Sequence, residues 1–270
     1  MGKLRDFHKS LNDRIKENPG VWKLAVVLRT IVVLVAIRCA WAGRWEQFML
    51  CLVVLFLFIV PSLLERKFKM EIPSTLEVIV LLFAFAAEIL GEIGGYYQAI
   101  PWWDTMLHTL CGFLAAAVGF ALVDILNRTP SVKFDLSPAY CTFVAICFAM
   151  TVGTVWEFFE FSVDYFFGQD MQKDVVVNSF ASVMLGGDGT RPLFLNDITA
   201  STINGIDYGL GGYLDIGLYD TMQDMFVNAV GALVFSIFGY RYLATHGEDK
   251  LAASLIPIAD DGLEEERALS

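Results

Sequence analysis

Charged residues are scarce in this chain of 270 residues: they make up 18% of it, against ~25% in an average soluble domain. Cysteine occurs five times, always inside apolar runs and never as a CxxC pair, so no disulfide framework can be inferred. Three histidines are present, and no HExxH segment occurs. Together with 56% hydrophobic residues, these shortages exclude a soluble cytosolic enzyme, a nucleic-acid-binding domain and a secreted disulfide scaffold.

Long apolar runs account for the rest of the composition. A helix needs ~20 mostly apolar residues to cross a hydrocarbon layer of ~30 Å, because it rises ~1.5 Å per residue. Enough such runs are present to predict an all-α fold, a polytopic membrane helical bundle of about six transmembrane helices. The runs are residues 22–40, 46–64, 75–97, 102–126, 138–163 and 218–243.

The distribution of Lys and Arg predicts the orientation. With both termini in the cytoplasm, the inner segments hold fourteen of these residues and the outer segments four, which fits the positive-inside rule. We therefore expect a multi-pass protein of the cell (inner or plasma) membrane. Its predicted parts are a basic cytoplasmic segment (1–21), a transmembrane domain (22–243) with one long external loop (168–217), and a solvated acidic cytoplasmic tail (244–270). A short helical or re-entrant piece is expected within the external loop, around 175–185.

Ionisable residues stand at helical spacing in four of the six runs. Such residues cost a few kcal/mol each at the bilayer centre, so they normally face a protein interior, a cavity or one another. In the predicted orientation all four sets lie in the outer half of the membrane, which predicts one acid-rich cluster there. The sets are Glu88 and Glu92; Asp104 and His108; Glu157, Glu160 and Asp164; and Asp220, Asp224 and Asn228.

Carboxylates that meet without matching basic residues repel one another unless they hold protons or share a cation. One histidine with several carboxylates suits a divalent metal ion such as Mn, Fe or Zn. The deepest three residues, His108, Glu157 and Asp224, are the predicted metal ligands. Asp104, Glu160 and Asp220 would orient these ligands or handle a proton, and they are the predicted catalytic residues.

Three functions remain open on this pattern. The first is a metal-binding membrane enzyme that acts on a lipid-linked or envelope substrate at the outer leaflet. The second is a cation or proton transporter, although no inverted repeat is visible. The third is a non-catalytic envelope or lipid-binding protein whose acids serve helix packing. Membrane lipid and a divalent cation are the expected partners, and nucleic acid is not.

Three short motifs resemble a family of bacterial polytopic inner-membrane proteins typified by YjdF. They are Trp103-Asp104-x3-His108, Glu157-x2-Glu160, and Asp220-Thr221-x2-Asp224 leading to Gly231-Ala232, in the same order as in that family. More distantly, the pattern is similar to the VanZ family, which is associated with teicoplanin resistance. The resemblance implies a polytopic inner-membrane protein that shares these motif positions, and it implies no particular activity.

Overall fold

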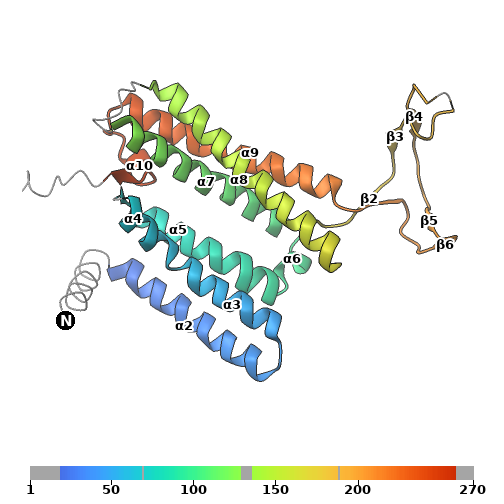
Figure 1. The fold of residues 1–270 in the computed structure, drawn as a ribbon, viewed down its shortest axis with the longest axis horizontal. Coiled ribbons are helices and arrows are strands. Elements are labelled where there is room, and N and C mark those ends of the chain that lie inside the picture. The colour runs from blue at the N-terminus through green and yellow to red at the C-terminus, as the bar shows by residue number, and fades with distance from the viewer. Residues whose placement is uncertain (1–18, 69, 129–135, 188, 260–270) are drawn as a thin grey trace, which may run out of the picture. The chain divides into compact units, whose positions relative to one another are not determined.

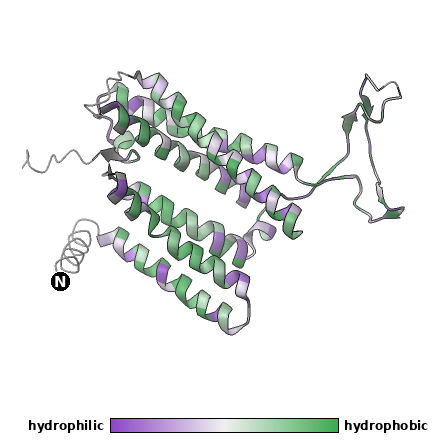
Figure 2. Cartoon of the chain, in the orientation of Figure 1, coloured by the Kyte–Doolittle hydropathy of each residue, from purple (hydrophilic) through white to green (hydrophobic). Residues whose placement is uncertain are grey.

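The structure is a computed structural model that describes residues 19–68, 70–128, 136–187 and 189–259 (Figure 1). Among these residues, five helices are long and apolar enough to cross a membrane, and hydrophobic residues cover most of each one (Figure 2). The prediction of an all-α polytopic membrane bundle is confirmed. The five helices are Pro19–Trp41, Trp45–Glu65, Trp103–Asp124, Pro138–Phe167 and Leu218–Ala244.

By its internal contacts the chain forms two compact units, residues 1–150 with 228–270, and residues 151–227. In the first unit, α2 (Pro19–Trp41) turns at Gly43 into α3 (Trp45–Leu57), which leads into α4 (Val60–Phe68). Arg29, the basic residue inside the first apolar run, donates from Nη2 to the carbonyl oxygen of Phe58 at 3.0 Å. This bond supplies a partner for a guanidinium group that lipid would otherwise surround.

The third predicted span is helical but irregular. It begins as α5 (Ser74–Ala84), continues without a break as the π-helix η1 (Phe85–Ile93), and is followed by the short α6 (Tyr96–Ala99). Gly95 between them has φ +73°, a conformation that favours glycine. At Gly91 a Cβ would overlap the Tyr97 ring, so a side chain there would require this ring of α6 to shift. Glu88 lies in this π-helix and is half-buried.

The remaining long helices are α7 (Trp103–Arg128), α8 (Pro138–Phe167) and α9 (Leu218–Ala244). Within the first unit, α7 and α9 touch backbone to backbone, because a Cβ at Gly112 would overlap the carbonyl group of Asn228 and one at Gly231 would overlap that of Thr109. Small residues at such crossings are the usual way for membrane helices to approach closely. Phe120 and Phe235, both fully buried, pack edge-on beside the crossing with ring centroids 5.9 Å apart.

In the second unit, short antiparallel ribbons connect α8 to α9. They are β2 (Val175–Val177) with β7 (Tyr213–Asp215), β3 (Phe180–Ser182) with β4 (Leu193–Leu195), and β5 (Thr202–Ile203) with β6 (Ile206–Asp207). The helical piece predicted around 175–185 is therefore wrong. Its β-branched valines favour a strand, and the Asn178 amide donates to the carbonyl oxygens of Ile198 and Gly211, which fixes the ribbon.

The C-terminal region is folded as far as the described residues extend. Asp249 accepts hydrogen bonds from the first backbone amides of α10 (Lys250–Ala253) and pairs with Arg241 at 2.7 Å. Further on, β8 (Ile258–Ala259) pairs with β1 (Met70–Glu71), and Ile256 is completely buried. The prediction of a solvated tail is thus wrong for residues 249–259, because this segment finds apolar contacts and a strand partner. The acids of 260–270 lie outside the described residues.

Candidate functional site

Asp104 and His108 stand on the first two turns of α7. The Asp104 Oδ1 atom and the His108 Nε2 atom are 3.5 Å apart, as expected for residues at i and i+4 on one helix face. His108 is 9% exposed, so most of the imidazole ring is covered by other parts of the protein. A carboxylate beside a histidine ring is a common arrangement at metal centres, where it fixes the ring orientation.

Asp224 and Asn228 occupy successive turns of α9 and are each 1% exposed. The Asn228 Nδ2 atom donates to the carbonyl oxygen of Ala149 on α8 at 3.2 Å, which sets the orientation of the amide. Its Oδ1 atom is buried and has no hydrogen-bond partner among the described residues. A buried amide oxygen without a partner is energetically costly, so a ligand that satisfies it would be stabilised there.

Glu157 and Glu160 lie on α8, 4% and 7% exposed respectively. The Glu160 Oε1 atom accepts a hydrogen bond of 2.7 Å from the indole Nε1 of Trp156. This bond holds the carboxylate against the helix that carries it. Tryptophan near the end of a spanning helix usually belongs to the interfacial aromatic belt, and Trp156 also binds a buried acid.

Asp164 and Asp220 bind backbone amides at the start of the connection between α8 and α9. The two carboxylate oxygens of Asp164 accept from the backbone amides of Met171 and Gln172 at 2.7 and 2.8 Å. One oxygen of Asp220 accepts from the amide of Lys173 at 2.7 Å. The structure thus shows a structural contact for Asp220, and its catalytic role stays a prediction.

Other acids near these anchors repel one another. Desolvation, followed by the charges of Asp170, Asp215 and Asp164, raises the pKa of Asp174 above the ordinary range of an aspartate. The Asp174 carboxyl group lies in the connection between α8 and α9, outside the membrane-spanning helices. Its ionised form therefore weakens this part of the fold at neutral pH.

Of the predicted site residues, Asp104 and His108 stand together as a carboxylate/histidine pair on one face of α7. A histidine nitrogen and carboxylate oxygens are ligands that Mn, Fe and Zn accept. Asp224, Glu157, Glu160 and Asp220 belong to the second compact unit, and their part in a shared site stays a prediction. Asp104 had been predicted as a catalytic residue, and its place beside His108 makes it a candidate ligand.

One buried acid was missed by the sequence reasoning. Asp124, near the other end of α7, is 3% exposed. Its place at the end of an apolar run resembles an acid that reaches water at the interface, and this is why it attracted no interest. The sequence carries no clear signal for it; one turn further on, the Asn127 Oδ1 atom accepts a hydrogen bond from the amide of Leu136 at 3.0 Å.

Comparison with protein families gives one match, over residues 22–245, to the family described as "Predicted membrane protein (DUF2238)". The match covers the long helices and the connection between α8 and α9. Comparison with curated proteins and with solved structures gave no match. The family description agrees with the membrane-spanning helices and assigns no activity.

Proposed function

We propose that this chain, which belongs to the DUF2238 family of predicted membrane proteins, binds a divalent cation at Asp104 and His108 of α7, with Asp224 of α9 as a third ligand, and acts on a lipid-linked or envelope substrate. The observation that carries the proposal is the pair of a half-buried Asp104 and a buried His108, 3.5 Å apart, on a helix long and apolar enough to span the membrane. Such a pair is rarely kept in a membrane span without a functional reason.

Helix geometry supports the inclusion of Asp224. Gly112 of α7 meets Asn228 of α9, and further along both helices Phe120 meets Gly239, so the two helices run in the same direction where they touch. One turn before Gly112 is His108, and one turn before Asn228 is Asp224. Because both helices continue regularly through these turns, His108 and Asp224 are expected at the same level.

The ligand chemistry also supports a cation. Asp104 and Asp224 offer oxygen ligands and His108 a nitrogen ligand, and the partnerless Oδ1 of Asn228 lies one turn further along α9. Amide oxygens bind hard cations directly or through water. A bound cation would supply Lewis-acid activation of water, and Glu160, oriented by Trp156, is the carboxylate proposed to accept the proton.

Metal analysis of protein purified without chelator tests the proposal, with Mn²⁺ as a titrating probe read by electron paramagnetic resonance. Replacing His108 by Ala or Asp224 by Asn should weaken Mn²⁺ binding at least about tenfold, since even residues outside the ligand set typically change affinity by that factor. Asp197→Asn is the matched control, because Asp197 is exposed and its φ of 54° suits asparagine.

Wild-type protein that holds no metal, and gains no thermal stability from Zn, Mn, Mg or Ca, would refute the cation site. If the cation binds, a turnover assay with lipid-linked substrates and a flux assay in vesicles separate an enzyme from a transporter. Flux without turnover would favour the transporter.

A further inference from the structure

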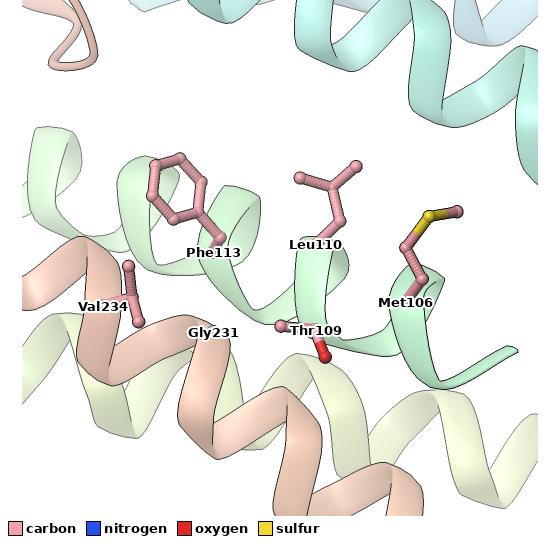
Figure 3. A pocket seen from close by; sticks show the side chains of 6 residues that line it. All are labelled: Met106, Thr109, Leu110, Phe113, Gly231 and Val234. Atoms are coloured by element: carbon pink, nitrogen blue, oxygen red, sulfur yellow. The ribbon is translucent and has the colours of Figure 1, made fainter. Parts of the chain in front are cut away.

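An apolar groove runs along α7 and α9 (Figure 3). By helical spacing it lies on a different side of α7 from Asp104 and His108. Met106 and Leu110 each stand two residues from His108, which is about half a helical turn. The groove has a volume of about 280 Å³ and is open on one side. It is lined by Met106, Thr109, Leu110, Phe113, Gly231 and Val234.

The groove offers a ligand nothing polar to bind. Thr109 carries the one side-chain hydroxyl of the lining, and its Oγ1 atom already donates to the carbonyl oxygen of Thr105 at 2.7 Å. The backbone groups of Gly231 belong to the regular part of α9. A ligand with hydrogen-bonding groups would therefore lose partners on entering, whereas a hydrocarbon would lose none.

The groove has a floor and an end. The glycine contact of Gly231 with the Thr109 carbonyl brings the two helices together and forms the floor. At the inner end, the Phe113 ring packs edge-on against Phe235 with centroids 5.3 Å apart. From Met106 to Phe113 the groove follows about 10 Å of helix axis. An apolar cavity of about 150 Å³ holds one benzene molecule, so this groove has room for roughly a dozen carbon atoms.

We propose that this groove binds one hydrocarbon chain of a membrane lipid. Both helices that form it are long and apolar enough to span a membrane, where the surrounding solvent is acyl chain. Selectivity for the groove over the rest of the lipid-facing surface would come from dispersion contacts on several sides of the chain, since no hydrophobic driving force operates within lipid. The proposal goes beyond the cation site and stands without it.

Photo-crosslinking tests this site. The full chain is reconstituted in phosphatidylcholine vesicles that contain a small share of phosphatidylcholine with a diazirine on one acyl chain, and labelled peptides are identified after irradiation. We expect labelling of the 106–113 segment and Val234 to exceed, per exposed area, that of Leu34 on α2 and Phe56 on α3, which are 61% and 59% exposed.

Substitution of Leu110 by Trp fills the groove and should lower labelling of the 106–113 segment about fivefold. The control is Leu233→Trp, because Leu233 is an exposed residue of α9 that does not line the groove. If Leu110→Trp does not elute as a single folded species, Val234→Trp fills the same groove from α9. Mn²⁺ binding is measured in parallel, and a wild-type chain that binds no Mn²⁺ while the groove is labelled as expected would refute the cation site alone.

Labelling in proportion to exposed area, unchanged by either groove-filling variant, would overturn the proposal, since it would show surface lipid only. The proposal would also be overturned if the groove is not labelled and the Leu110→Cys variant crosslinks to the same residue of another copy. In that case a second copy of the chain covers the groove.

Discussion

Substitution of Gly231 by Ala tests the contact between α7 and α9. The added methyl group would overlap the Thr109 carbonyl oxygen and lie 2.9 Å from the backbone nitrogen of Phe113. Both atoms belong to the backbone of α7, so they cannot rotate away as the end of a side chain could. The two helices must therefore move apart along the crossing, and the floor of the apolar groove opens.

The expected effect combines two opposing contributions. Overpacking of a close contact typically costs ~1–3 kcal/mol. Replacing glycine by alanine in a helix interior gains up to ~1 kcal/mol. Because the methyl group meets backbone atoms, the upper part of the first range applies, ~2–3 kcal/mol, and the net loss is about 1–2 kcal/mol. This loss corresponds to a lower unfolding midpoint by about 2–8 °C, at ~2–4 °C per kcal/mol for a chain of this size.

The assay is thermal unfolding in one detergent at a fixed scan rate, reported as an apparent midpoint because such unfolding is often irreversible. The control is Gly20→Ala in α2, where an added Cβ meets no atom within 4 Å, and its midpoint should stay equal or rise. Gly112→Ala acts at the same crossing, so the double variant should lose less than the sum of the two single losses. Equal midpoints for Gly231→Ala and Gly20→Ala would refute the reasoning.

Three further predictions concern regions outside the membrane-spanning helices. Backbone amides at the start of α10 lower the pKa of Asp249, so the stability that its carboxylate contributes is present above the ordinary aspartate pKa and is lost as the pH falls through the lowered pKa. The protection of residues 250–256 against hydrogen exchange, corrected for the intrinsic rate at each pH, should therefore fall in acid, and Asp249→Ala should remove this dependence. Asp164→Ala should speed hydrogen exchange of the Met171 and Gln172 amides, which Asp164 binds, and Asp164→Asn should have an intermediate effect. Asp174→Asn should slow hydrogen exchange of residues 171–177 at neutral pH, because ionisation of Asp174 disfavours the folded state. In a cysteine-free background, Ala200→Cys should react with an impermeant reagent from outside and Glu248→Cys only after the cells are opened; the reverse result would contradict the predicted orientation.

The membrane bundle was predictable because hydrophobic length alone determines which segments can span. What the runs could not show is how the backbone behaves within them. The run 75–97 is equally apolar as an α-helix or as a π-helix, and the change at Phe85 is a property of the folded backbone that composition does not carry. The orientation depends on this element, since five spans place the termini on opposite sides and a sixth returns them to the same side.

The folded C-terminal segment was missed for a related reason. Acids dominate the composition of residues 246–270 as a whole, while the structure of 249–259 rests on a non-local strand pair between Ile258–Ala259 and Met70–Glu71. A pairing across almost 190 residues leaves no periodic signal in either partner. The ribbons between α8 and α9 depend likewise on Asn178, whose amide bonds reach residues that spacing does not link to it.

At the site, helical spacing correctly identified which acids share a stripe, but it could not show what stands opposite each stripe. Asp164 and Asp220 follow the same pattern as Asp224, yet they accept backbone amides of the connection between α8 and α9. Asp224 stands one turn further along α9 than Asp220 and is almost completely buried. Partner identity is a tertiary property, which is why the predicted ligands and the predicted supporting residues could not be separated from the sequence.

The two proposals place different chemistry on two sides of α7. Asp104 and His108 share one side with Gly112, whereas Met106, Leu110 and Phe113 form the other. Because side chains half a turn apart do not touch on one helix, a substitution on one side should leave the other side intact. His108→Ala should therefore reduce Mn²⁺ binding without changing lipid labelling, and Leu110→Trp should do the opposite. Loss of both properties in either variant would mean that α7 itself had moved, and neither result could then be assigned to a site.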